Sequence, residues 1–254
     1  MASTPASAPS QPAPPSVSSF GRVFGALVNP KPTFESIAQR PSWVLPMLLV
    51  LLCSIVIIAV IGQRIGWHAV VEKQIANSAR AQKQMEQMPA EQRQRIIDQQ
   101  TKFASVVGYV SVVIATILGE VVVAALLLAV FNLMSGSKIG FSTSLGIVAH
   151  SWMPYFIGGI LSIIVLYIKD PSTVDVQNIV ATNPGALLSS DSPKWLVSLL
   201  TSLDLLTFWV IALQAIGFSA TNPKKISFGK AFGSIFAVWF VYVLIKMGLA
   251  AAFS

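Results

Sequence analysis

The chain has little charge and few reactive side chains. Only 11% of its 254 residues are Asp, Glu, Lys or Arg, whereas a soluble domain carries roughly a quarter. The single cysteine, Cys53, excludes an intrachain disulfide and cysteine-based metal chelation within one chain. The two histidines, His68 and His150, would need carboxylates from distant segments to complete a zinc site.

The sequence also lacks the short motifs that carry common catalytic chemistry. It has no GxxxxGK[ST] phosphate loop, no HExxH zinc motif, no GxSxG nucleophile turn and no CxxC pair. We therefore expect no enzymatic activity, no cofactor and no metal site.

Long apolar runs dominate what is present. Residues 43–62 read WVLPMLLVLLCSIVIIAVIG without one charge, and as a helix they would be roughly 30 Å long, the thickness of the hydrocarbon core of a bilayer. Comparable stretches recur at 104–134, 143–168, 195–218 and 228–253. The pattern predicts an all-α integral membrane protein, a bundle of about five transmembrane helices.

Three flanking segments differ in composition from the spans. Residues 1–19 contain mainly Ser, Pro and Ala, and we expect this tail to be disordered. In residues 20–42, the side chains of Phe20, Val23, Phe24, Leu27 and Val28 fall at helical spacing on one face, which predicts an amphipathic helix at the membrane interface. The hydrophilic insertion 63–103 is rich in helix formers and predicts an extramembrane helical loop, so that the transmembrane domain covers residues 43–254.

Basic residues in loops and flanks explain the net charge of +7. Such residues orient spans and contact anionic lipid, so this charge does not indicate nucleic-acid binding. With the N-terminus inside, seven basic residues of the flanks and turns would face the cytoplasm, but the 63–103 loop on the other side also carries seven. Charge alone therefore favours a cytoplasmic N-terminus only weakly.

Among the ionisable residues within predicted spans, Glu120, His150 and Asp204 are the candidates for an intramembrane polar site. A charged group at mid-bilayer costs at least a few kcal/mol, so it should be paired, face the bundle or serve a function. For Glu120, two interpretations stay open: a relay or polar ligand site, or a carboxyl group hydrogen-bonded to a neighbouring helix. His150 is a candidate titrating partner for either acid.

Other polar and small residues in the last two spans have structural interpretations. Hydroxyl groups of Thr201, Ser202 and Thr207 could donate hydrogen bonds to Asp204. Lys246 could extend to the membrane surface. The small residues Gly229 and Gly233 form a pattern suited to close helix contact.

Several segments resemble bacterial Yip1-domain proteins. The segment NPKPTFESIAQRPSWVLP is similar to the motif before the first span of that family, through Pro30, Thr33, Phe34, Ile37 and Pro41. The third span resembles the family through Ser151, Trp152 and Pro154, although the family often has a Tyr near the position of His150. The last two spans match at Asp204, Phe208, Trp209, Gly217 and the pair Lys230-Ala231.

This resemblance covers roughly residues 20–254 and implies five transmembrane helices, with a cytoplasmic N-terminus and the C-terminus across the membrane. Eukaryotic relatives are implied to act in vesicle trafficking, binding small GTPases and shaping membranes. The bacterial members imply no settled activity, and no GTPase-binding motif can be placed on residues of this chain.

Two functions follow as hypotheses for a multi-pass protein of the bacterial inner membrane. The first is a non-enzymatic scaffold that recruits membrane or peripheral proteins, or organises lipid, through residues 20–42 and 63–103. The alternative is a small transporter or permease component that uses the intramembrane Glu120, with Asp204 and His150 as further candidates. In both cases the bilayer is a partner, nucleic acid is not, and a homo-oligomer is left open.

Overall fold

A computed structural model describes residues 18–189 and 192–252 of the chain, so most of the predicted tail 1–19 lies outside the described residues. Helices make up most of the described part, and the described ranges contain no strand. Within these ranges, four helical segments are long and apolar enough to cross a membrane. A fifth candidate is a pair of helices that together are long enough but are bent relative to each other. The predicted all-α membrane bundle of about five spans is confirmed.

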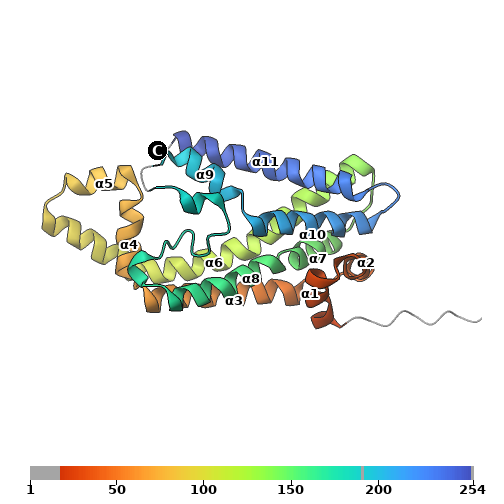
Figure 1. Ribbon diagram of the computed structural model, residues 1–254, viewed down its shortest axis with the longest axis horizontal. Coiled ribbons are helices and arrows are strands. Elements are labelled where there is room, and N and C mark those ends of the chain that lie inside the picture. The colour runs from red at the N-terminus through yellow and green to blue at the C-terminus, as the bar shows by residue number, and fades with distance from the viewer. Residues whose placement is uncertain (1–17, 190–191, 253–254) are drawn as a thin grey trace, which may run out of the picture.

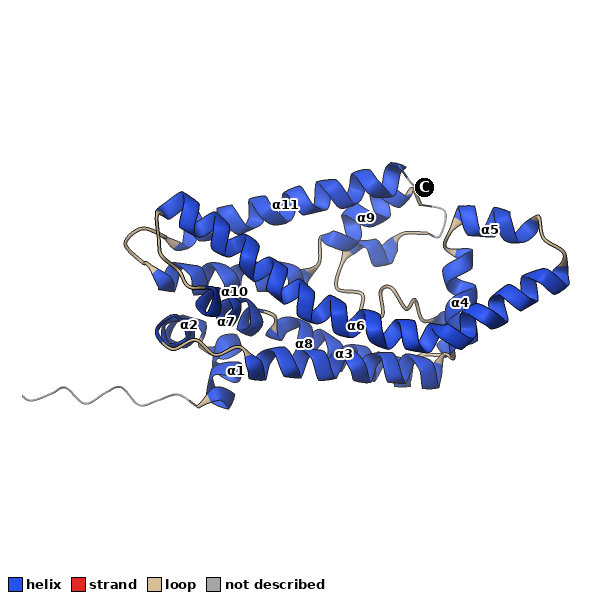
Figure 2. Ribbon diagram, turned by 180° about the vertical axis from the view of Figure 1, so that it is seen from behind, coloured by secondary structure: helices blue, strands red, loops and turns tan. Residues whose placement is uncertain are grey.

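The candidate spans run alternately between the two ends of the bundle (Figure 1). They are α3 (Val44–Arg64), α6 (Ala90–Ser135), α7 with α8 (Phe141–Ser151 and Met153–Ile168), α9 with α10 (Lys194–Ser202 and Leu205–Thr221), and α11 (Phe228–Ala252). Figure 2 shows α6 extending along the whole length of the molecule. Its 46 residues give a length of roughly 70 Å, more than twice the hydrocarbon core.

The central helix of the bundle is α7, in which the eight residues from Ser144 to Ser151 are all buried. Its buried hydroxyl groups donate to backbone carbonyls, Ser144 to Ala124 at 2.7 Å and Ser151 to Ile147 at 2.7 Å. Hydrogen bonds of this kind satisfy buried polar groups that would otherwise destabilise the bundle. The bond from Ser144 thus joins α7 to α6, and the bond from Ser151 stays within α7.

Close helix contact in this core depends on Gly217 of α10. A Cβ atom there would overlap Ile147 of α7 and would lie 2.9 Å from Cδ1 of Phe34. Next to it, the rings of Phe218 and Phe131 stack with their centroids 4.5 Å apart. The absence of a side chain at residue 217 thus lets α10 approach both α7 and the N-terminal helices.

The N-terminal helices α1 (Ser19–Val28) and α2 (Pro30–Gln39) lie at one end of the bundle, opposite the C-terminal end of α11 (Figure 1). The five apolar residues grouped on one face of α1 do not share one environment. Val23 is buried and Leu27 packs against the core, whereas three are exposed: Phe20, Phe24 and Val28. The expected interfacial helix is therefore anchored by one side of its apolar face and presents the other outward.

The insertion 63–103 forms a helical arm, defined here as residues 67–103. It contains α4 (Trp67–Ala76), α5 (Ala79–Glu86) and the first part of α6, and it projects beyond the bundle (Figure 1). The chain enters the arm through Gly66, whose φ of 83° is a left-handed conformation that glycine adopts without strain. At its base, Trp67 packs against α3 and α6 near Gly62 and Gly108.

Two of the predicted spans are interrupted. The third is divided at Trp152, where Pro154 occupies the first turn of α8, a position that tolerates its missing amide donor. The fourth bends by 48° between α9 and α10, at Leu203 and Asp204. The apolar stretch 195–218 therefore forms two helices, with side-chain and loop contacts at the break in place of helical hydrogen bonds.

Candidate functional site

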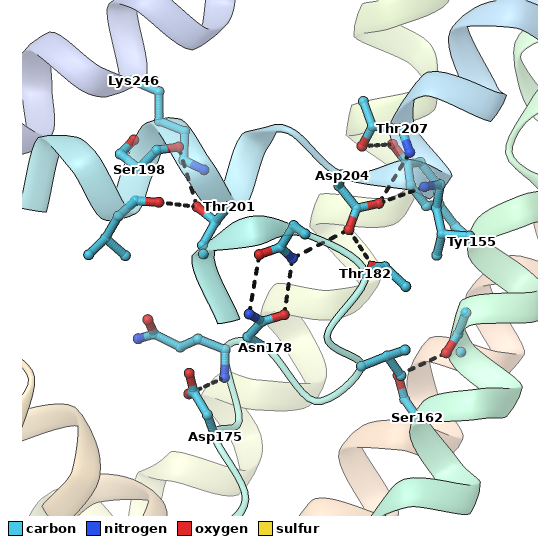
Figure 3. A pocket seen from close by; sticks show the side chains of 18 of the residues that line it. Tyr155, Ser162, Asp175, Asn178, Thr182, Ser198, Thr201, Asp204, Thr207 and Lys246 are labelled. Atoms are coloured by element: carbon cyan, nitrogen blue, oxygen red, sulfur yellow. Dashed lines mark hydrogen bonds between the residues drawn. The ribbon is translucent and has the colours of Figure 1, made fainter. Parts of the chain in front are cut away.

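A polar cavity of about 750 Å³ lies beside the break in the fourth span (Figure 3). Its walls come from α8, α9, the start of α10, the C-terminal part of α11, and residues 175–185 of the loop that follows α8, which reach into the short 3-10 helix η2 (Pro184–Leu187). Cavities of this size accommodate small ligands or headgroups. Polar side chains from distant parts of the sequence meet in it, among helices that are otherwise apolar.

Asp204 lies at the centre of the polar network. One carboxylate oxygen accepts hydrogen bonds from the backbone amides of Leu206 at 2.8 Å and Thr207 at 3.2 Å, which caps the N-terminus of α10. The other oxygen accepts from the hydroxyl of Thr182 and from the side-chain amide of Asn183 at 3.4 Å. Four donors therefore satisfy this carboxylate without a cation.

These partners differ from the predicted ones. The hydroxyls of Thr201 and Ser202 donate to backbone carbonyls of α9, and the hydroxyl of Thr207 is 3.1 Å from that of Tyr155. Only the backbone of Thr207 contacts Asp204. The loop, rather than the neighbouring turns of the span, supplies the side-chain donors, because the break turns the carboxylate out of its own helix.

The loop is held in place by paired amides. Asn178 and Asn183 donate to each other's side-chain oxygens, at 3.3 and 3.1 Å, as Figure 3 shows. The backbone amide of Leu205 also donates to the carbonyl of Thr182 at 3.1 Å. These contacts close the loop over one side of the cavity.

Lys246 lines the opposite side of the cavity. Its Nζ donates to the hydroxyl of Ser202 in α9 at 3.3 Å. Ser198, one turn before Ser202, also lines the cavity, and its hydroxyl is buried without a hydrogen-bond partner. This wall thus combines an ammonium group with hydroxyls.

Glu120 lies elsewhere, on the buried stripe of α6 that also holds Thr116, Ala124, Leu127 and Phe131. It is 0% exposed, and neither carboxylate oxygen has a hydrogen-bond partner among the described residues. The interpretation of Glu120 as a carboxyl group hydrogen-bonded to a neighbouring helix does not agree with this arrangement. Its burial is achieved by packing alone.

His150 is fully buried in α7. Its Nδ1 is 2.8 Å from the carbonyl oxygen of Gly146 and must donate, since a carbonyl only accepts. Its Nε2 has no partner. In the described part of the chain the one ion pair joins His68 to Glu72, so His150 pairs with neither Glu120 nor Asp204. Of the three predicted site residues, the structure brings only Asp204 to the cavity.

Sequence reasoning missed one buried cation, Arg22 of α1. Its Nη1 donates to the carbonyl of Arg40 at 2.7 Å and to the hydroxyl of Ser42 at 3.2 Å, which ties α1 to the segment before α3. A charge on an otherwise apolar helix was the available signal. Asn178, Thr182 and Asn183 were missed because their loop carries no motif.

The residues behind the family resemblance have structural positions. Phe34 and Ile37 are fully buried, and the Thr33 hydroxyl donates to the carbonyl of Asn29 at 2.8 Å. Pro30 begins α2, Pro41 follows it, Pro154 is buried at the start of α8, and Trp209 is partly exposed on α10. They shape the lead-in and the spans rather than the polar cavity.

Across residues 18–189 and 192–252, no group of three or more His, Cys, Asp or Glu side chains is arranged to hold a metal ion. The cavity instead offers hydroxyls, amides, the ammonium groups of Lys194 and Lys246, and the carboxylates of Asp175 and Asp204. Such groups recognise a ligand by hydrogen bonds and charge. These features define a multi-pass α-helical membrane protein with a polar cavity at a broken span.

Within that class the chain belongs to the Yip1 family, because the Yip1 domain matches residues 24–250, nearly its whole length. The family resemblance of the motifs is thereby confirmed. No curated protein and no solved structure shows significant similarity to the chain. The family is not one of known enzymes, so the membership supplies a fold and a membrane setting without catalytic residues.

Proposed function

We propose that the protein is a non-enzymatic membrane scaffold that binds a partner protein through its helical arm. The observation that carries the proposal is that the arm projects from the bundle while contributing little to its core. Within the described part of the arm, α5 has no buried residue, α4 buries only Val71, and the segment 90–103 buries only Ile97. A segment that exposes so much helix is available to a partner.

The arm is also held in a defined orientation, as a binding surface requires. Its α6 portion continues directly into the second span. Arg93 donates to the carbonyl of Met85 at 3.1 Å, which joins the two sides of the arm, and Trp67 packs at its base. A partner would therefore meet a preformed surface, which lowers the entropic cost of binding.

For the membrane orientation, we place the end that carries α1 and α2 in the cytoplasm and the arm on the opposite side, in a bacterial inner membrane. Basic residues at the α1–α2 end, including Lys224 and Lys225 in the turn before α11, favour this placement. The arm itself is basic, with exposed side chains such as Arg80 and Lys83. An acidic surface on a partner would complement it.

The test uses the full-length protein in lipid nanodiscs made from its own membrane. A stoichiometric partner should co-purify, and its chemical cross-links should map to residues 67–103. The double variant R80E/K83E should lose it, whereas the matched variant K224E/K225E, at the other end of the molecule, should retain it. Cross-links confined to other segments, or retention by R80E/K83E, would refute the arm as the docking site.

A second function, transport, is favoured by one specific observation. The carboxylate of Glu120 is fully buried in α6 with no partner, and such an intramembrane acid is a functional candidate by default. Glu120→Gln keeps the shape of the side chain and removes its charge. Proton or solute flux in reconstituted vesicles should fall at least tenfold in this variant. An unchanged flux, in vesicles where the parent protein transports, would eliminate Glu120 from the path.

A further inference from the structure

The polar cavity is lined by a cation, Lys246, that forms no ion pair with either aspartate of the lining, Asp175 or Asp204. Lys246 lies within the last span, α11, and its ammonium is partly buried. Its hydrogen-bond partner is a neutral hydroxyl, that of Ser202, and among the described residues the only ion pair is the distant His68–Glu72. A charged residue inside a span is costly and marks a ligand site when nothing in the protein neutralises it.

A second, independent feature lies on the same wall. Ser198 is 7% exposed, and its hydroxyl lines the cavity with no hydrogen-bond partner. Because Ser198 and Ser202 are one turn apart on α9, they present their hydroxyls along one face, and Lys246 reaches this helix from α11. Figure 3 shows Lys246 and Ser198 at this side of the cavity.

Asp204 does not neutralise this arrangement. Its two oxygens are occupied by the amides of Leu206 and Thr207 and by the side chains of Thr182 and Asn183. The network therefore holds the loop in place and leaves the ammonium of Lys246 and the hydroxyl of Ser198 on the opposite wall to another acceptor. Two donors on one wall, the charged ammonium of Lys246 and the unpartnered hydroxyl of Ser198, match an anion with several oxygens, such as a phosphate.

The surroundings of Lys246 indicate the source of this anion. Its neighbours on α11, Ile245 and Leu249, are exposed large apolar side chains on a helix that spans the membrane. An acyl chain can lie along this surface while the headgroup enters the cavity. A free phosphate has no acyl chain to contact this apolar surface.

We propose that the polar cavity binds a phosphate-ester anion, the headgroup of an anionic phospholipid, through Lys246 and Ser198. This ligand site is independent of the proposed scaffold function of the arm. The cavity volume of about 750 Å³ is in the range of small-molecule sites. The acyl chains stay in the bilayer along α11.

The test is native mass spectrometry of the full-length protein in detergent, with phosphatidylglycerol or phosphatidylcholine added at equal concentrations. The parent protein should retain one phosphatidylglycerol with about tenfold preference, as expected for a hydrogen-bonded ion pair. Lys246→Met should abolish this preference and Lys246→Arg should keep it. The control Lys230→Met removes an exposed lysine from the other end of α11 and should leave retention unchanged.

The variant Ser198→Ala is a second test that leaves the charge of Lys246 in place. It should weaken the retention of phosphatidylglycerol about threefold to tenfold. If Lys246→Met does not yield monodisperse protein, Ser198→Ala and Lys246→Arg decide the question. Equal retention of both lipids by the parent protein, or full retention of phosphatidylglycerol by both Lys246→Met and Ser198→Ala, would overturn the proposal.

A third experiment distinguishes a lipid headgroup from a soluble phosphate as the ligand. Inorganic phosphate and glycerol 3-phosphate are added to lipid-free protein, and thermal unfolding is followed. Stabilisation that disappears in Lys246→Met, without any lipid preference, would overturn the lipid source and assign the cavity to a soluble phosphate. Stabilisation by phosphatidylglycerol alone supports the proposal.

Discussion

The ammonium group of Lys73 in α4 donates a 2.9 Å hydrogen bond to the carbonyl oxygen of Val174 in the loop that follows α8. Further bonds from the same group reach the carbonyls of Pro171 at 3.2 Å and Ser172 at 3.1 Å. The arm and the loop over the polar cavity, about a hundred residues apart in sequence, are thus joined by one side chain. This contact gives the arm a physical connection to the cavity.

Lys73→Met should loosen both segments. Three hydrogen bonds from a charged donor are lost, but the site is partly exposed to water, so we expect a local destabilisation of about 1 kcal/mol. Hydrogen–deuterium exchange should become faster in residues 67–76 and 170–176 and stay unchanged in α7. The matched variant Lys83→Met, at an exposed lysine of α5, should leave exchange in residues 170–176 unaltered.

The same loop contains an acid whose titration the structure predicts. The hydroxyl and the backbone amide of Ser172, assisted by the positive charge of Lys73, hold the pKa of Asp170 below its ordinary value. Because the folded pKa is depressed, the stabilisation by this turn is present above the unfolded pKa and is lost as the pH falls through the folded one. A carbon-13 NMR titration should find the pKa of Asp170 raised toward its ordinary value in Ser172→Ala. An unchanged titration would show that Ser172 is not its main partner.

Gly217→Ala should destabilise the bundle. The added methyl group would overlap Ile147 and crowd Phe34, and overpacking of this kind costs about 1–3 kcal/mol. The control is Gly233→Ala in α11, where no atom lies within 4 Å of the added Cβ. Because alanine favours helix, that variant should be as stable as the parent or slightly more stable, by up to about 1 kcal/mol.

Thermal unfolding in detergent measures both glycine variants. A Gly217→Ala protein as stable as the parent would mean that α10 can move away from α7 and α2. Conversely, a clear loss of stability in Gly233→Ala would indicate a close contact of that face with a second copy of the chain, which the Gly229–Gly233 pattern had left open.

Asp204→Ala should both uncap α10 and release the loop. Loss of an N-cap alone costs about 1 kcal/mol, and the Thr182 and Asn183 side chains lose their acceptor as well. We expect a destabilisation of about 2 kcal/mol with increased protease sensitivity within residues 175–189. Asp204→Asn retains an oxygen that can cap α10, so it should unfold closer to the parent. Equal stability of the alanine variant would show that the network does not hold the loop.

The sequence by itself determined the membrane class, the spans and the projecting arm. Hydrophobic length is a local property, because a segment such as 43–62 needs no neighbour to be too apolar for water. The charged composition of 63–103 likewise predicted its position outside the spans. The family followed from motifs along the whole chain.

Only the tertiary structure decided which polar residues meet. The α6 helix is apolar on all sides around Glu120, so no periodicity distinguishes its buried stripe from its lipid-facing one. The side-chain partners of Asp204, Thr182 and Asn183, belong to a loop without a motif. Lys246 donates a hydrogen bond to Ser202, which lies 44 residues earlier in the sequence. In this bundle the polar cavity lies where the fourth span breaks, and there the N-cap Asp204 is joined to a distant loop by contacts that the local sequence does not reveal.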